Sequence, residues 1–269
     1  MSRRLFLAAA AGALALAATG GAFAQTKEIR VGFFPGPYAD QFKRGVQPVL
    51  EKQGYKITAT EFSNAIQPNS AVMDGSLDVN IFQNKAFMEA FNEQNKGDIV
   101  EVLRIPSAPL GLYSQKLKAV SEIKEGMKIS LPNDPTNMGR ALAFLQTAGL
   151  LRIDPNAPAG RATDKNVTDN PKKLVLVPLD APQIPRALPD VDVAAALGNH
   201  VLAAGMLLSQ AIALEDPAPQ YQIIIAGRKA NAEAQWMKDL VSAYKSPDFR
   251  NFVEKDPKTI GFSKPDYWR

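Results

Sequence analysis

Residues 128–140 read KISLPNDPTNMGR, and this stretch indicates the architecture of the whole chain. An apolar run ends at Leu131, a polar loop rich in proline and asparagine follows, and a helical pattern then carries Arg140 near its first turn. We expect Thr136 or Asn137 to cap that helix. A strand that leads through a short loop into a helix is the repeating unit of α/β folds.

The same order of strand, loop and helix continues on both sides of this stretch. Toward the N-terminus, the predicted strands cover residues 28–34, 55–62, 77–82 and 99–105, and the predicted helices cover 38–53, a short segment after Pro68, and 85–95. Toward the C-terminus, the predicted strands cover 127–131, 174–177, 191–197 and 221–226, the predicted helices cover 137–151, 183–188 and most of 231–254, and residues 154–170 form a loop without a helical or strand period.

Strands separated by helices of this length predict an α/β fold in which each lobe is a doubly wound, mainly parallel sheet with flanking helices. Residues 106–109 interrupt the pattern, which resumes at residues 110–114. We therefore predict two lobes, one formed by residues 25–108 and 222–269 and the other by residues 109–221, with a ligand cleft between them. Ligands of such folds bind at the carboxyl ends of strands, and a hinge closes the lobes around them.

The two halves of the chain also resemble each other. In the first half, a strand that opens on Asp78 leads to Asn84 and a helix. In the second half, a strand that opens on Asp192 leads to Asn199 and a helix. Both asparagines suit helix N-caps, because a short side-chain oxygen can accept a hydrogen bond from the first turn.

Residues 1–24 have the pattern of an export signal. Arg3 and Arg4 precede an alanine-rich apolar run, and small residues at Ala22 and Ala24 predict cleavage before Gln25. The paired arginines fit either a twin-arginine signal or a general secretory signal. We expect a soluble periplasmic protein without a lipid anchor, because a lipoprotein signal needs a cysteine at the cleavage point.

Composition excludes several kinds of chemistry. The chain has 269 residues with no cysteine and one histidine, His200, which rules out thiol nucleophiles, disulfides, cysteine zinc sites and clusters of several histidines. Loss of Arg3 and Arg4 with the signal lowers the formal charge from +4 to +2, and no block of like charges suggests nucleic-acid binding. No Gly-x-Ser-x-Gly elbow, P-loop or GxGxxG motif is present. We therefore expect a binding protein that is not an enzyme and holds no cofactor or metal.

The candidate ligand-binding residues are Arg140, Phe82, Asn199, Asn84, Asn137 and Tyr38. Arg140 lies near a helix N-terminus, where free amides attract anions, and its guanidinium can hold a carboxylate through two hydrogen bonds. Gly139 would let a ligand approach closely. The alternatives remain open: Arg140 can instead form a structural salt bridge, Asn84 can serve only as a cap, and Phe82 can belong to the core.

Several segments together resemble the NlpA family, the methionine-type substrate-binding proteins of ABC importers. The resemblance covers nearly the whole mature chain, and its most specific segments are residues 35–39 (PGPYA), 67–69 (QPN), 82–83 (FQ), 109–114 (PLGLYS), 132–137 (PNDPTN), 139–142 (GRAL) and 170–174 (NPKKL). It implies a type II periplasmic binding-protein fold, a small ligand delivered to a membrane permease with its ATPase, and a monomer. It also implies that Arg140 holds the ligand carboxylate and that Phe82 lies beside the ligand side chain.

Four positions depart from the family pattern. Ala65 replaces a tyrosine, Asn84 replaces a histidine, Leu197 replaces an asparagine, and Ile223 replaces an asparagine in the late strand. These changes alter the size and polarity of the pocket, because a ligand group that loses a hydrogen-bond partner costs about 1–3 kcal/mol. The expected ligand is methionine or another amino acid or derivative. The alternatives are a ligand that is not an amino acid, or a metal-uptake protein, which the scarcity of soft and imidazole ligands disfavours.

Overall fold

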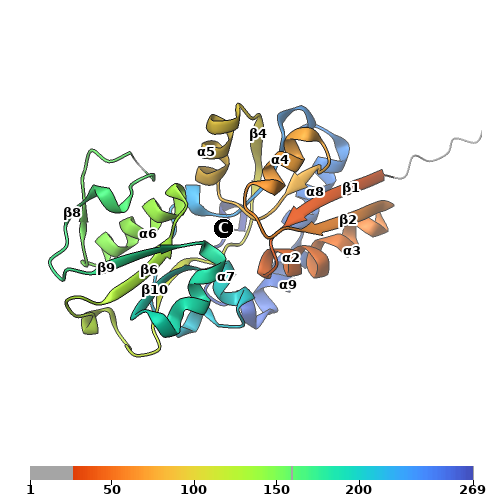
Figure 1. The fold of residues 1–269 in the computed structure, drawn as a ribbon. Coiled ribbons are helices and arrows are strands. Elements are labelled where there is room, and N and C mark those ends of the chain that lie inside the picture. The colour runs from red at the N-terminus through yellow and green to blue at the C-terminus, as the bar shows by residue number, and fades with distance from the viewer. Residues whose placement is uncertain (1–26, 159, 269) are drawn as a thin grey trace, which may run out of the picture.

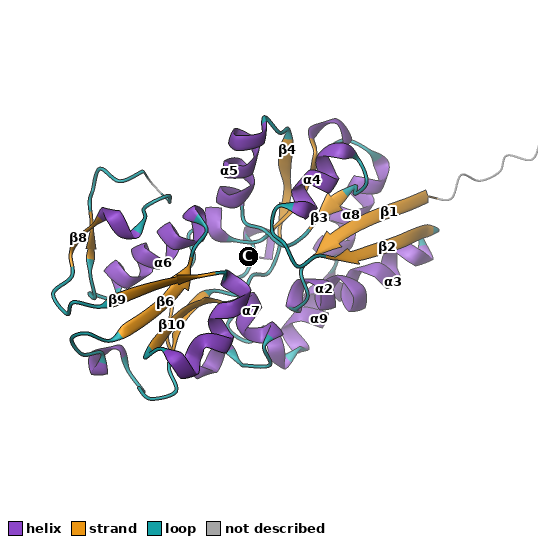
Figure 2. Cartoon of the chain, in the orientation of Figure 1, coloured by secondary structure: helices purple, strands orange, loops and turns teal. Residues whose placement is uncertain are grey.

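The computed structural model describes residues 27–158 and 160–268 of the chain. In this part, two five-stranded sheets lie in separate halves of the molecule, and helices pack on the faces of each sheet (Figure 1, Figure 2). This arrangement confirms the predicted two-lobed α/β fold. The predicted signal segment, residues 1–24 with cleavage near Ala24, lies outside the described residues.

The first sheet has the strand order β2-β1-β3-β12-β4. Its strands are β1 (Lys27–Phe33), β2 (Tyr55–Glu61), β3 (Val79–Asn80), β4 (Ile99–Arg104) and β12 (Ile224–Arg228). β1 pairs in parallel with β2 and β3, whereas β12 lies antiparallel between β3 and β4. Ile29, Val31 and Phe33 alternate along β1 and therefore project from one face of the sheet, where their apolar side chains are fully buried in a single core cluster.

The second sheet has the order β11-β5-β10-β6-β9. Its strands are β5 (Leu110–Tyr113), β6 (Lys128–Pro132), β9 (Val175–Leu179), β10 (Val193–Leu197) and β11 (Ala211–Leu214). β6 pairs in parallel with β9 and β10, and β5 pairs antiparallel with β10 and β11. Both sheets are therefore mixed, with a parallel part and an antiparallel part.

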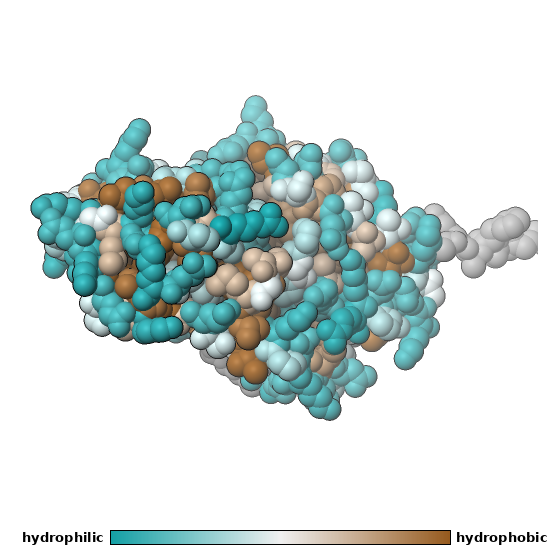
Figure 3. All heavy atoms as spheres, turned by 60° about the horizontal axis from the view of Figure 1, so that its bottom comes forward, coloured by the Kyte–Doolittle hydropathy of each residue, from teal (hydrophilic) through white to brown (hydrophobic). Residues whose placement is uncertain are grey.

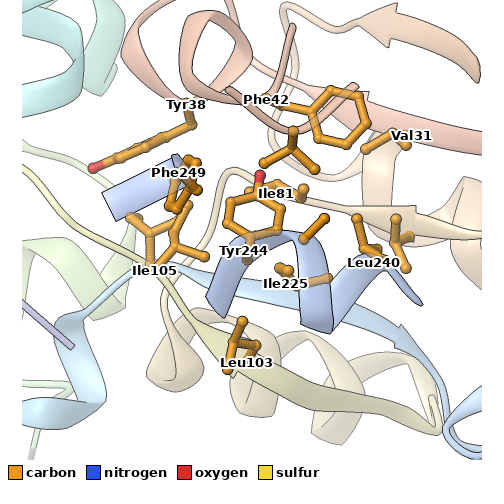
Figure 4. Close-up of a cluster of buried hydrophobic side chains, with 14 of the residues drawn as sticks. Val31, Tyr38, Phe42, Ile81, Leu103, Ile105, Ile225, Leu240, Tyr244 and Phe249 are labelled. Carbon is orange, nitrogen blue, oxygen red and sulfur yellow. The ribbon is translucent and has the colours of Figure 1, made fainter. Parts of the chain in front are cut away.

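The helices are α2 (Pro37–Gln41), α3 (Gln47–Lys52), α4 (Gln67–Asp74), α5 (Lys85–Asn95), α6 (Pro135–Thr147), α7 (Gly198–Ala203), α8 (Gln235–Lys245) and α9 (Pro247–Lys255), and a π-helical turn (Phe42–Val46) joins α2 to α3. The aromatic and aliphatic side chains of α8, α9 and the π-helical turn form the core against the first sheet (Figure 4). On the face shown in Figure 3, hydrophobic side chains lie in separate groups among hydrophilic ones.

Helix α5 follows its prediction closely. Asn84 caps it, because the side-chain oxygen accepts a hydrogen bond of 2.9 Å from the backbone amide of Phe87. The helix ends where Lys96 adopts a left-handed conformation with φ of 52°. The cap predicted for Asn84 is thus confirmed.

Two other predicted caps are wrong. Asn199 lies inside the first turn of α7, whose N-cap is Leu197. Helix α6 is capped by Asp134, whose carboxylate accepts a hydrogen bond of 3.0 Å from the backbone amide of Asn137. Pro135 follows Asp134, and proline favours the first helical position, so the helix begins earlier than its apolar pattern indicates.

Three short strands are not predicted by the sequence. β7 (Arg152–Ile153) and β8 (Val167–Asp169) pair with each other, so the predicted loop at residues 154–170 includes an ordered strand. β11 is the third. The helix predicted at residues 183–188 is a 3-10 helix (Ala181–Asp190), because the prolines at 185 and 189 cannot donate helical hydrogen bonds.

The chain passes from the first sheet to the second between β4 and β5, and it returns between β11 and β12. The first passage is held by Ser107, which forms an isolated bridge with Ser263 and whose hydroxyl accepts a hydrogen bond of 2.7 Å from the amide of Ile223. The predicted lobe boundaries, at residues 108–109 and 221–222, fall in these two passages and remain a prediction about the units that move.

Candidate ligand-binding cleft

Strands β1 and β6, one from each sheet, point their carboxyl ends toward the middle of the molecule (Figure 1), where residues that follow strands of both sheets lie close together. Phe34, after β1, has its ring centroid 6.1 Å from that of His200 in α7. In a second contact between the two halves, the side-chain amide nitrogen of Asn84 lies 3.4 Å from the side-chain oxygen of Asn137 in α6. This is the position at which ligands of open α/β sheets bind.

Arg140 is buried in α6, with 4% of its side chain exposed, and it pairs with Glu215, whose side chain is 8% exposed. Its Nε donates a hydrogen bond of 3.1 Å to one carboxylate oxygen of Glu215, and its Nη2 donates to the other. Two of the five N–H groups of the guanidinium are therefore used within the protein, and among the described residues Nη1 donates to none. The part of Arg140 that faces away from Glu215 keeps two parallel N–H groups on Nη1 and Nη2.

Two tyrosines lie around this pair. The guanidinium of Arg140 lies 5.0 Å from the ring centroid of Tyr221, a cation–π geometry. Tyr38, from α2, is within electrostatic range of both Arg140 and Glu215, although burial is the main reason that its hydroxyl pKa is raised. The Tyr38 hydroxyl points away from the apolar cluster (Figure 4) and accepts a hydrogen bond of 3.1 Å from the amide of Ala108.

The segment from β6 to α6 owes its shape to Asp134. In addition to the amide of Asn137, its carboxylate accepts two hydrogen bonds of 3.1 Å from the side-chain nitrogen of Asn137. Burial raises the pKa of Asp134, and these hydrogen bonds act in the opposite direction. Asn137 is thereby oriented toward Asn84, so that two of the candidate residues meet across the gap.

Gly139 does not serve the role predicted for it. A Cβ atom at this position would lie 2.8 Å from the carbonyl carbon of Gly160, so the missing side chain admits protein backbone. The segment that holds Gly160 also covers a cavity of about 910 Å³, which is lined by α6, by residues near β7 and β8, and by Tyr221. None of the six candidate residues lines this cavity, although Tyr221 borders it and also stacks with Arg140.

Phe82 directly follows the end region of β3 and packs in an aromatic group. Its ring centroid is 4.8 Å from that of Phe34 and 6.1 Å from that of Phe87. With 6% exposure it contributes to the first lobe as well as to the edge of the cleft. The neighbouring Gln83 is turned inward, where its amide bonds to Asn69 and Asn80.

Asn199 and His200 lie at the start of α7, and each is 8% exposed. Among the described residues, the structure shows no side-chain hydrogen bond for Asn199. Burial lowers the pKa of His200 to about 4, so the imidazole is neutral at pH 7. Both side chains are therefore neutral polar groups, and the His200 ring lies close to that of Phe34.

Two of the positions that depart from the family pattern are direct neighbours. Asn84 and Ile223 form an isolated antiparallel bridge, and residues paired in this way project their side chains on the same side. A third, Leu197, pairs with Leu110 at the end of β10. The resemblance thus implies that an apolar side chain replaces an amide at Ile223, beside Asn84, and at Leu197, beside Leu110.

Sequence reasoning did not find Glu215 or Tyr221. Glu215 follows β11, a strand of four residues without polar alternation, and it is 75 positions from Arg140. Tyr221 lies in a short 3-10 turn before β12. In the part of the chain that the structure describes, no helix is long and apolar enough to cross a bilayer, and no three acidic or histidine side chains gather as metal ligands.

Comparison with known proteins gives consistent results. The family model described as NlpA lipoprotein matches residues 29–264. The D-methionine-binding lipoprotein MetQ of Salmonella typhi is 33% identical over 247 residues, which are 91% of each chain. A nutrient-binding protein from Burkholderia cenocepacia, solved bound to methionine, is 38% identical with a TM-score of 0.80, over 84% of this chain and 95% of that one.

A periplasmic substrate-binding protein of an ABC transporter from Coxiella burnetii is 35% identical with a TM-score of 0.81, over 88% of this chain and 99% of that one. Sequence and structure comparisons therefore lead to the same group of proteins.

Proposed function

The chain belongs to the NlpA lipoprotein family, and from that premise we propose that it is the substrate-binding component of an ABC importer, which captures a small ligand that bears a carboxylate. The ligand class is methionine or another amino acid or derivative. One observation carries this proposal: Arg140 is buried near the other candidate residues, and on the side away from Glu215 it has two N–H groups whose hydrogen bonds no described residue accepts. Planar guanidinium groups suit carboxylates in this geometry.

The other candidate residues surround that group. Tyr38 lies near Arg140, and Asn137 is hydrogen-bonded to Asp134. Asn84 and Asn199 carry amide side chains, and the ring of Phe82 forms an apolar wall. These contacts support binding without chemical conversion of the ligand.

We also propose the cellular setting. The chain is exported to a periplasm, cleaved near Ala24, and acts as a monomer that delivers its ligand to a permease and its ATPase at the inner membrane. The support comes from relatives that are named as lipoproteins or as periplasmic substrate-binding proteins of an ABC transporter.

The proposal is tested by a thermal-shift screen of the mature protein with amino acids, short peptides and organic acids, followed by calorimetry of each hit. A ligand at a hundred times its dissociation constant stabilises the fold by about 2.7 kcal/mol. Arg140→Lys should weaken binding of the hit by at least about tenfold, because lysine keeps the charge but loses the paired donors. Lysine is preferable to alanine here, since alanine would leave the buried Glu215 without its cation.

Arg152→Lys is the matched control, because Arg152 has 80% of its side chain exposed and should leave the affinity unchanged. The proposal is wrong if no amino acid, peptide or organic acid binds, if only transition metals stabilise the protein, or if Arg140→Lys retains full affinity.

A further inference from the structure

Glu215 is held in place by the neighbouring strand. Its backbone amide donates a hydrogen bond of 3.0 Å to the carbonyl of Leu110, and its carboxylate accepts one of 2.7 Å from the amide of Leu110. The carboxylate is therefore anchored to β5 independently of Arg140. It presents a fixed negative charge to the guanidinium, with both of its oxygens engaged.

The carboxylate of Glu215 sets the net charge around Arg140. In the described part of the chain, Arg140 is the only lysine or arginine that is fully buried. Glu215 cancels its charge, and the other candidate polar groups (Asn84, Asn137, Asn199 and Tyr38) carry none. His200, next to Asn199, is neutral at pH 7. Asp134 adds a buried acidic group at the start of the same helix, where the positive end of the helix dipole balances part of its charge.

A ligand carboxylate that binds the outward N–H groups of Arg140 would bring a second negative charge to a guanidinium that is already neutralised. Two like charges in a buried site repel each other strongly, and water cannot screen them well. A cationic group on the ligand itself, close to its carboxylate, removes this penalty because the ligand then enters with no net charge.

We propose that Glu215 makes this cleft selective for ligands without net charge, so that a zwitterionic amino acid binds in preference to the 2-hydroxy acid of the same shape. The inference rests on the proposed function and adds a residue that sets its specificity. Glu215 acts in two ways: it fixes the orientation of Arg140 through two hydrogen bonds, and it offsets the charge of Arg140.

The test uses two pairs of probes with matched side chains: L-methionine with 2-hydroxy-4-(methylthio)butanoate, and L-leucine with 2-hydroxy-4-methylpentanoate. Calorimetry at pH 7 measures each probe on the mature wild-type protein and on Glu215→Gln. Wild type should bind the amino acid of the better pair at least about tenfold more tightly than the hydroxy acid. Glu215→Gln should bind the hydroxy acid at least about tenfold more tightly than wild type does, because its amide can still accept the hydrogen bond from Leu110 but no longer carries the charge.

Two variants separate charge from position. Glu215→Asp keeps the charge and should keep the wild-type preference, even if a displaced Arg140 weakens both probes of a pair. Asp216→Asn removes an exposed acid one residue away, and it should behave as wild type. Circular dichroism and thermal unfolding establish that each variant is folded.

The results distinguish the two proposals. Equal binding of both members of a pair to wild type, or an unchanged preference in folded Glu215→Gln, overturns the role of Glu215 and leaves the proposed function intact. Binding of hydroxy acids alone to wild type contradicts selectivity for neutral ligands. Absence of binding by every probe to both proteins, after a screen without hits, overturns both proposals.

Discussion

At the scale of single residues, the burial of His200 makes the stability of the fold depend on pH. Its imidazole is buried and neutral in the folded protein, with a pKa of about 4, whereas in the unfolded chain it takes up a proton near pH 6.5. The unfolded state therefore binds more protons between these two values. His200 thus contributes stability above pH 6.5 that is lost as the pH falls through this window.

We predict that wild type loses about 2 kcal/mol of unfolding free energy through His200 between pH 7 and pH 5, relative to His200→Gln. The measurement is urea unfolding of both proteins across this range. Because the chain contains no other histidine, no second imidazole contributes to the difference. Parallel pH profiles of the two proteins would contradict this prediction.

Single residues also show where sequence reasoning reaches its limit. The place of Arg140 near a helix start is local information, which makes it a candidate from the sequence, and its role toward a ligand stays a prediction. Its partner Glu215 could not be identified in this way, since 75 positions separate them and only the pairing of β11 with β5 brings them together. The cap of α6 was misassigned because Asp134, Thr136 and Asn137 are all plausible caps, and Pro135 decides among them.

At the scale of elements, local signals explain most of the success. Helix α5 has a capping asparagine, an apolar face and a left-handed end, and each signal lies within the segment itself. β11 lacks such signals, because the sequence AIAL carries neither alternation nor turn residues and its pairing depends on β5. Strand β12 was predicted, but its place between β3 and β4 is a property of the sheet and not of the segment.

The start of α7 packs closely against the segment that connects β4 to β5. A Cβ atom on Gly198 would collide with the carbonyl oxygen of Pro109 and would lie 2.8 Å from the Cβ of Ala108. We predict that Gly198→Ala lowers the unfolding free energy by about 1–3 kcal/mol, because backbone must move to admit the methyl group.

Urea unfolding measures this effect, and calorimetry shows whether ligand affinity falls with it. Ala204→Ser, at an exposed position after the same helix, serves as the control and should change stability little. A Gly198→Ala protein as stable as wild type would show that the passage is free to move.

At the scale of the whole molecule, few polar contacts between described residues connect the two halves near the candidate residues. Asn84 meets Asn137, and Glu93 of α5 forms an exposed ion pair with Arg161 from the segment between β7 and β8. The exposed ion pair contributes little to holding the halves together, whereas the contact between Asn84 and Asn137 is buried.

We predict that ligand binding reduces the radius of gyration measured by small-angle X-ray scattering, because a ligand held by both lobes favours the closed arrangement. The hit from the amino-acid screen is added at saturation, and Arg140→Lys at the same ligand concentration should show a smaller change. An identical radius with and without the bound ligand would contradict both the hinge and the predicted lobe boundaries.

The position of β12 has a consequence for the order in which the protein assembles during synthesis. All five strands of the second sheet lie between residues 110 and 214, whereas the first sheet lacks the strand between β3 and β4 until residues 224–228 have been made. The half of the protein that the ribosome produces first is therefore the last to be completed. A chain that stops before residue 224 would leave two strand edges unpaired, and such edges recruit other chains. Premature termination should thus produce aggregates even when nearly all of the protein has been translated.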